Sequence, residues 1–135
     1  MTETFVDAVA WIALVNKRDS LHEKAKKVFA DLHRQNYEFI TTEFVLIEFA
    51  NALSAPDFRD KAASFIEGLR ESPTVRIVPA SSELFSIGLR LYRNRLDKEW
   101  SLVDCTSFVV MKERKIVEAF TEDHHFEQSG FIKLL

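Results

Sequence analysis

The sequence predicts an α/β protein in which helices cover both faces of a central, mainly parallel sheet of four or five strands. Short β-prone runs alternate with longer amphipathic segments along the 135 residues, and no linker or repeat interrupts them. This alternation is typical of βαβ units, whose right-handed crossovers place successive strands parallel in one sheet. We therefore expect a single domain spanning residues 1–135.

The first half of the chain is expected to contribute two strands and three helices. Residues 4–8 form a β-prone run that passes directly into the apolar stretch 9–15, expected to be a short buried helix. Residues 37–41 are expected to form the second strand, and residues 43–53 a helix that is apolar nearly all round. Between the first helix and the second strand, Ser20 and Glu23 have the spacing of a capping box, and the helix after it has one apolar face: Leu21, Ala25, Val28, Phe29 and Leu32.

A fourth helix, a third strand and a fifth helix follow. Pro56 in a first turn predicts a helix that begins near Ser54 and ends before Pro73. Residues 75–79 read as a strand that closes on its own proline, and residues 81–95 as an amphipathic helix.

The last part of the chain is expected to return to the sheet. Ser101 has the character of a helix N-cap, with Asp104 three residues further on. A polar link at residues 112–115 leads into a strand-like run over 116–121, and residues 131–135 are compatible with a terminal strand.

Composition excludes several classes of protein. The net charge of −3 argues against a protein that holds nucleic acid mainly through counterion release, and three glycines leave no glycine-rich phosphate loop. One cysteine forms no internal disulfide, and no apolar run is long enough to span a bilayer. The N-terminal Met-Thr-Glu-Thr lacks the basic region of a signal peptide, so we expect a cytoplasmic protein with no membrane contact.

Three aspartates stand at junctions between the expected elements. Asp7 closes the first strand, Asp123 follows the fourth, and Asp104 opens the helix that begins at Ser101. In parallel α/β folds these positions share one edge of the sheet, where ligands bind. Each also has a structural explanation, because an aspartate at such a place caps a helix or completes a capping box.

Glu48 is the acid that is hardest to explain structurally. It lies in the expected helix over residues 43–53 among apolar side chains, and only Asn51 shares its side. A carboxylate held out of water is costly unless something compensates its charge, so a buried salt bridge or one exposed stripe are the alternatives. Four acids at one sheet edge would supply the hard oxygen ligands that hold Mg²⁺ or Mn²⁺.

Other candidate ligands have simpler explanations. His124 and His125 are adjacent, so they are not expected to face one site together on a regular element. Together with Cys105, which is expected in the core, they lack a recognised zinc-ligand spacing. A basic cluster could contact phosphates, although a solvated helix face is the favoured interpretation: Arg90, Arg93, Arg95 and Lys98.

Four segments, in this order, resemble the PIN domain and, within it, the VapC-type toxins of bacterial and archaeal toxin–antitoxin pairs. They cover residues 5–14, 41–53, 101–108 and 119–126, and together they extend over nearly the whole chain. There is one departure: the family often has a threonine or serine just after the first aspartate, where this chain has Ala8 and then Val9.

The resemblance implies a three-layer α/β/α PIN-like fold and a metal-dependent endoribonuclease that uses Mg²⁺ or Mn²⁺. Carried over by position, it implies an acidic quartet and a set of supporting or phosphate-contacting residues: Asp7, Glu48, Asp104 and Asp123, with Asn51, Ser107 and Thr121. The implied partners are an RNA substrate, a small antitoxin that covers the groove, and a second copy of the chain in a homodimer. Two alternatives remain: a PIN-like module that acts through protein binding without cleavage, and an RNA-processing nuclease that has no antitoxin.

Overall fold

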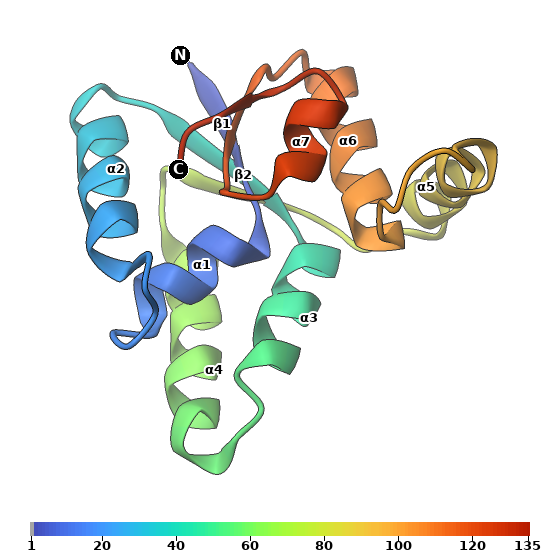
Figure 1. Cartoon of the computed structure of the whole chain (residues 1–135). Coiled ribbons are helices and arrows are strands. Elements are labelled where there is room, and N and C mark those ends of the chain that lie inside the picture. Colours follow the sequence, from blue (N-terminus) through green and yellow to red (C-terminus); the bar gives the residue numbers. More distant parts are fainter. Residues whose placement is uncertain (1) are drawn as a thin grey trace.

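The central sheet contains five strands, and all neighbouring strands are parallel. The computed structural model describes residues 2–135, and in it the strands are arranged in the order β3-β2-β1-β4-β5 (Figure 1). Their bounds are β1 Glu3–Val6, β2 Glu38–Thr42, β3 Val75–Val78, β4 Glu118–Phe120 and β5 Ile132–Lys133. The predicted parallel sheet of four or five strands is therefore confirmed.

Seven helices occur within residues 2–135; they cover both faces of this sheet, except that α5 packs on the outer side of α6, away from the strands (Figure 1). They are α1 Ala8–Val15, α2 His22–Arg34, α3 Glu43–Ala52, α4 Pro56–Glu71, α5 Ser82–Asn94, α6 Leu102–Arg114 and α7 His124–Gln128. Helices α1 to α4 pack against one another on one face, and α6 packs against α5 and α7 on the other. Helices α3 and α6 also touch, so the two layers meet beyond one edge of the sheet. Within residues 2–135, no helix combines the length and apolar character needed to cross a membrane.

The strand order reverses at β1. From β1 the chain moves outward to β2 and β3, and it then returns to place β4 on the other side of β1. Val6 lies beside Phe120 in the register of these two strands, and the Asp7 N–H donates to the Phe120 carbonyl at 3.3 Å. In open α/β sheets, ligands bind outside the carboxyl ends of the strands at such a reversal. The residues that follow β1 and β4 therefore lie where a site is expected.

Aromatic side chains fill the space between the sheet and the helices. Phe5, Phe39 and Phe120 are fully buried on the strands, and Phe126 of α7 packs edge-on against Phe108 of α6 at 5.0 Å between ring centroids. The buried Trp11 indole N–H donates to Thr41 Oγ1 at 3.2 Å, so its polar atom is satisfied. This packing holds the strand ends rigidly.

One predicted helix start is wrong. Ser20 and Glu23 form no capping box: α2 begins at His22, with Leu21 as an N-cap that makes no side-chain capping bond. Ser20 lies inside a turn instead: Asp19 Oδ1 accepts from the Leu21 N–H at 2.8 Å, and the Asp19 carbonyl accepts from the His22 N–H at 3.0 Å. An aspartate that bonds the backbone two residues on forms a turn, and this turn displaces the predicted cap.

Two predicted extents also differ from the structure. The polar link expected at residues 112–115 is mostly helical, because α6 continues to Arg114 and ends at Lys115, whose φ of 58° is left-handed. The helix expected to be apolar all round, α3, is buried on only part of its circumference, and Ile47 is 55% exposed. Sequence hydrophobicity therefore overstated the burial of α3.

Candidate metal centre

The structure brings the four predicted acids together at the carboxyl edge of the sheet. Asp7 follows β1, Glu48 lies in the middle of α3, Asp104 lies in the first turn of α6, and Asp123 precedes α7. The negative charges of Asp104 and Glu48 raise the pKa of Asp7, and those of Asp104 and Asp123 raise the pKa of Glu48. Because charges interact this way only at short range, the quartet forms one cluster.

Asp7 is the most deeply buried of the four acids, with 2% of its surface exposed. It stands at the N-cap of α1, but its side chain makes no capping hydrogen bond there. Its Oδ2 accepts a hydrogen bond from Thr121 Oγ1 at 3.0 Å. Burial, followed by the charges of Asp104 and Glu48, raises the pKa of Asp7 to about 7. Helix capping therefore does not explain this carboxyl group.

Asp104 has both a structural partner and a place in the cluster. The Asp104 N–H donates to Ser101 Oγ at 2.9 Å, and the Ser101 N–H donates back to Asp104 Oδ2 at 3.2 Å. The predicted capping box is thus confirmed, and it fixes where this carboxylate points. Burial raises the pKa of Asp104, hydrogen bonding to Ser101 lowers it, and the charge of Asp123 raises it.

Glu48 is half-buried on α3. None of the ion pairs within residues 2–135 includes Glu48 or Asp7. Burial is the largest cause of the raised pKa of Glu48. Thr42 fixes the start of its helix by accepting from the Val45 N–H at 3.0 Å. The buried salt bridge offered as an alternative is therefore absent from the part of the chain that is described.

Thr121 links two of the acids. Its hydroxyl donates to Asp7 Oδ2 and accepts from the Asp123 N–H, each at 3.0 Å. Asp123 Oδ1 in turn accepts from the His125 N–H at 2.9 Å and so caps α7. One buried hydroxyl thus bridges the Asp7 side chain and the Asp123 backbone at the carboxyl ends of β1 and β4.

The other two expected supporting residues lie in different surroundings. Ser107, one turn after Asp104 on α6, is fully buried, and its Oγ has no hydrogen-bond partner among residues 2–135. Asn51 is exposed on α3 and lines a hollow of about 650 Å³ together with Ser54, Arg59 and Asp60. The roles expected for Ser107 and Asn51 stay predictions.

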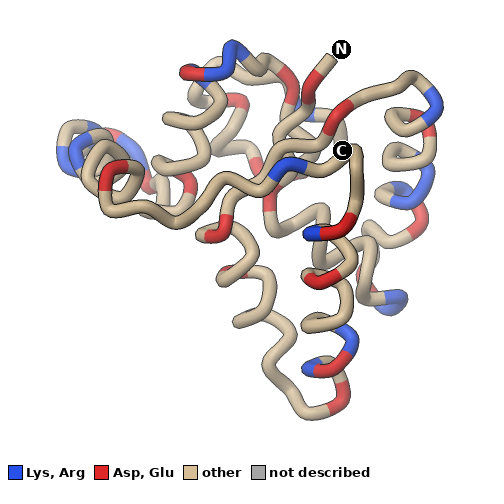
Figure 2. Tube along the Cα trace, turned by 180° about the vertical axis from the view of Figure 1, so that it is seen from behind, with Lys and Arg blue, Asp and Glu red and all other residues tan. Residues whose placement is uncertain are grey.

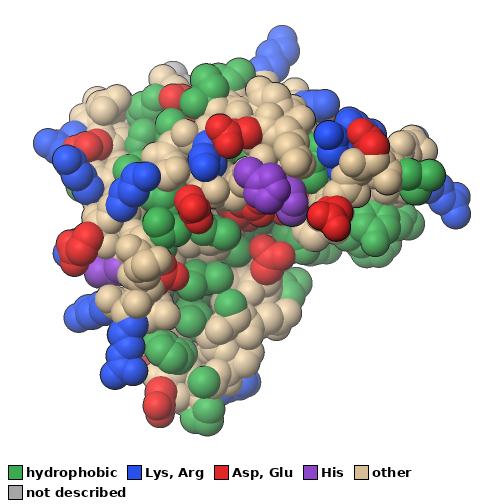
Figure 3. Space-filling view, viewed as in Figure 1, with side chains coloured by type: hydrophobic (Ala, Val, Ile, Leu, Met, Phe, Trp, Pro, Cys, Tyr) green, Lys and Arg blue, Asp and Glu red, His purple; other side chains and the backbone are tan. Residues whose placement is uncertain are grey.

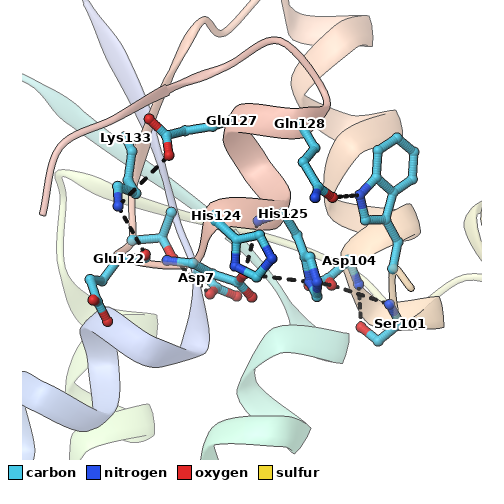
Figure 4. A network of polar contacts seen from close by, with 12 residues as sticks. Asp7, Ser101, Asp104, Glu122, His124, His125, Glu127, Gln128 and Lys133 are labelled. Carbon is cyan, nitrogen blue, oxygen red and sulfur yellow. Dashed lines mark hydrogen bonds and ion pairs between the residues drawn. The ribbon is translucent and has the colours of Figure 1, made fainter. Parts of the chain in front are cut away.

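Two histidines that the sequence argument set aside lie at this cluster. His125 Nδ1 is 3.1 Å from Asp104 Oδ2 and 3.4 Å from Asp123 Oδ1, and His124 Nδ1 is 3.7 Å from Asp123 Oδ1 (Figure 4). The expectation that adjacent histidines cannot share a site is wrong, because both open the short helix α7 directly after its cap. Figure 3 shows histidine side chains at the surface between α7 and α3, with acidic side chains around them. A sequence signal existed in their position straight after an acid at a strand end.

The donor set fits a hard divalent cation. The four acids form no ion pair with a lysine or arginine within residues 2–135, and the lysines and arginines lie mainly along α2, α4 and α5 and at the end of α6 (Figure 2). Arg95, from the basic cluster considered above, is engaged elsewhere: it pairs with Asp97 at 3.0 Å and lies over the Trp100 ring. Oxygen donors in this number and an unsatisfied Ser107 hydroxyl one turn from Asp104 are compatible with Mg²⁺ or Mn²⁺.

The fold and the site together define a doubly wound α/β protein with an acidic site where the strand order reverses. Comparison with known proteins gives the family. The family model of the PIN domain matches residues 4–132, and the chain belongs to the PIN domain family.

Relatives within this family match almost the full chain. The 23S rRNA-specific endonuclease VapC20 of Mycobacterium tuberculosis, in strains CDC 1551 and H37Rv, is 30% identical over 130 residues, which is 96% of each chain. The crystal structure of this VapC20, described as a toxin that cleaves the sarcin–ricin loop, superimposes with a TM-score of 0.86 at 29% identity, covering 97% of this chain and 98% of that one.

More distant solved structures share the fold alone. VapBC2 from Rickettsia felis, bound to a DNA fragment from its promoter, has a TM-score of 0.71 at 12% identity and covers 98% of both chains. FitAcB from Neisseria gonorrhoeae has a TM-score of 0.67 at 16% identity and covers 98% of this chain and 96% of that one.

Proposed function

We propose that this chain is a metal-dependent endoribonuclease and the toxin of a type II toxin–antitoxin pair. The observation that carries the proposal is the gathering of four acids, far apart in sequence, at the strand reversal, where neither Asp7 nor Glu48 forms an ion pair with a basic side chain of residues 2–135. The 30% identity to an endonuclease of ribosomal RNA supports the reaction class. In this proposal, residues 1–135 act as one PIN-like domain.

Asp7 and Asp104 would hold a Mg²⁺ or Mn²⁺ ion directly, and Glu48 and Asp123 would hold it through water or bind a second ion. When bound, the ion makes water a better nucleophile and offsets negative charge on the phosphate. Thr121 keeps the Asp7 carboxyl group in place through its hydrogen bond, and Ser101 does the same for Asp104. Glu48, whose pKa is raised, is suited to accept the proton of an attacking water.

The proposed partners are an RNA, a small antitoxin and a second copy of the chain. The first RNA to test is 23S rRNA, because the relative at 30% identity acts on it. Apolar side chains on one side of α5 are exposed, among them Phe85, Leu89 and Tyr92, and they offer surface for a protein partner.

Cleavage by the purified protein tests this proposal. The wild type and Asp104→Asn are incubated with 23S rRNA and other structured RNAs in Mn²⁺, in Mg²⁺ and in EDTA. We expect defined cleavage products that require the ion. The cleavage rate of Asp104→Asn should be reduced by at least about 100-fold, because a ligand and its charge are lost. The control is Asp97→Asn, which changes an exposed acid paired with Arg95 and should cleave like the wild type.

Two outcomes would contradict the proposal. If Asp104→Asn cleaves like the wild type, the acidic quartet is not the active site. If the wild type cleaves none of the RNAs with either ion, the protein-binding module is the better explanation. A short reading frame directly upstream, whose product blocks cleavage, separates the toxin from an RNA-processing nuclease without an antitoxin.

A further inference from the structure

The start of α7 carries three potential metal ligands that differ in chemistry from the acidic quartet. Asp123, His124 and His125 each offer one ligand atom, and these atoms lie within 4.8 Å of one another. His125 Nδ1 is 3.4 Å and His124 Nδ1 is 3.7 Å from the same oxygen, Asp123 Oδ1 (Figure 4). One carboxylate oxygen therefore faces two imidazole nitrogens.

These separations suit a four-coordinate zinc ion. Bonds of about 2.0–2.2 Å from zinc to nitrogen or oxygen place neighbouring tetrahedral ligands about 3.4 Å apart. The two distances from Asp123 Oδ1, 3.4 and 3.7 Å, lie near that value. Three protein ligands would leave the fourth position to water.

The surroundings of the three residues leave room for an ion. The His124 side chain is 69% exposed and lies 3.7 Å from Asp123 Oδ1, too far for a hydrogen bond, so solvent ions reach it freely. Two hydrogen bonds hold Asp123 in place. Its backbone N–H donates to Thr121 Oγ1, and its Oδ1 accepts from the His125 N–H. The acceptor is thus fixed before any ion arrives.

Ligand chemistry separates this trio from the quartet. Imidazole nitrogen favours zinc and other late transition metals, whereas carboxylates and water favour Mg²⁺ and Mn²⁺. Asp123 belongs to both sets, and His125 also contacts Asp104 at 3.1 Å. An ion on the trio would draw Asp123 away from the quartet and take the His125 nitrogen from Asp104.

We propose that Asp123, His124 and His125 form a zinc site beside the acidic quartet, and that zinc bound there inhibits the nuclease by withdrawing Asp123. The zinc site stands on its own geometry, while the inhibition rests on the proposed function. Free Zn²⁺ is the ligand, and the ion that supports cleavage is its competitor for Asp123.

Zinc affinity of the full chain tests the site. Zn²⁺ is titrated against a chromogenic chelator into the wild type, His124→Ala and the His124→Ala/His125→Ala double variant, and Co²⁺ binding is followed by its visible absorption. We expect one Zn²⁺ per wild-type chain, an affinity about tenfold lower in the single variant and about 100-fold lower in the double variant. His33→Ala, on the exposed end of α2, is the matched control and should bind like the wild type.

The outcomes distinguish the site from the nuclease. Asp7→Asn should lose cleavage but keep its zinc affinity, because Asp7 is not among the three ligands. Cleavage supported by Mn²⁺ is measured with and without added Zn²⁺. In the wild type, the rate with Zn²⁺ divided by the rate without it should be well below one. In His124→Ala this ratio should be closer to one. Wild-type zinc affinity in His124→Ala, whose exposed side chain is not needed for folding, would overturn the zinc site. Inhibition that is equal in the wild type and His124→Ala would overturn the regulatory role.

Discussion

Asp7 is the residue at which burial and the neighbouring acids act most strongly. Its pKa of about 7 lies above the ordinary value of 3.8, so the folded state prefers the protonated carboxyl group. Below about pH 4 this group is protonated in both states, and folding loses nothing. As the pH rises toward 7, the unfolded chain ionises Asp7 while the folded chain does not, and stability falls.

This sign gives the first prediction. The free energy of unfolding of Asp7→Asn minus that of the wild type should increase as the pH is raised from 4.5 to 7.5 in the absence of divalent ions. The increase should be about 2–4 kcal/mol, at about 1.4 kcal/mol per pKa unit. The measurement is urea unfolding of both proteins across this range. If the two proteins differ in free energy of unfolding by the same amount at pH 4.5 and pH 7.5, the pKa of Asp7 is not raised in the folded state.

For the single residues, the sequence predicted where the acids lie better than it predicted what they contact. Asp7, Asp104 and Asp123 were expected at element junctions, and they lie there. Asp104 and Asp123 also make the capping bonds that the structural alternative required, so capping and a place in the acidic cluster coexist. His125 was missed because its nearness to Asp104, 21 residues away in sequence, depends on how α7 packs against α6.

The elements that carry the acids make separate contributions to the site. Helix α6 begins with a complete capping box, in which Ser101 and Asp104 hold each other in place. Helix α5 has a simple serine cap, with Ser81 Oγ accepting from the Leu84 N–H at 3.0 Å. Both caps stabilise their helices, but only the Ser101 cap also positions an acid of the quartet. Comparing substitutions at Ser101 and Ser81 therefore separates the effect on helix stability from the effect on the position of Asp104.

We predict that Ser101→Ala lowers stability by about 1 kcal/mol and also weakens Mn²⁺ binding several-fold, because the Asp104 N–H loses its acceptor, Ser101 Oγ, and the first turn of α6 then holds the Asp104 carboxylate less firmly. Ser81→Ala should have a similar cost in stability and leave Mn²⁺ binding unchanged. Thermal unfolding and a Mn²⁺ titration measure the two quantities. Equal Mn²⁺ affinities for Ser101→Ala and the wild type would contradict the role given to this capping box.

The packing of α5 on α6 depends on one glycine. A Cβ atom at Gly88 would lie 2.6 Å from Thr106 Cγ2 and 3.3 Å from the Thr106 Cα, whereas one at Gly68 in α4 would meet nothing within 4 Å. Gly88→Ala should therefore cost about 1–3 kcal/mol through overpacking, and Gly68→Ala should stabilise its helix by about 0.5–1 kcal/mol. Chemical denaturation of both variants checks this, and equal effects at the two positions would contradict the close helix contact.

Local sequence signals predicted some elements and failed at others for a physical reason. Ser101 and Ser20 both precede an acid by three residues, and only Ser101 forms the capping box. At Ser20 the preceding Asp19 forms a turn through the Leu21 N–H, and Ser20 lies within this turn instead of at the helix N-cap. The spacing of a serine and an acid does not show where the backbone enters the helix, and a capping box requires the serine at that point.

At the scale of the whole molecule, the alternation of strands and helices was enough to predict a parallel sheet covered on both faces. The order β3-β2-β1-β4-β5 was not predictable in the same way, because a right-handed crossover can move to either side of the starting strand. That order places β4 beside β1 and so brings Asp7 and Thr121, 114 residues apart in sequence, into contact. The site is a consequence of the strand order.

The most direct test of a shared metal centre is to measure how many of the four acids contribute to the affinity for one Mn²⁺ ion. Mn²⁺ binding is measured by electron paramagnetic resonance for the wild type and for Asp7→Asn, Glu48→Gln, Asp104→Asn and Asp123→Asn, with Asp97→Asn as the control. We predict that each of the four quartet variants lowers the Mn²⁺ affinity by about tenfold or more, and that Asp97→Asn does not. Wild-type Mn²⁺ affinity in any two of the quartet variants would contradict a shared metal centre.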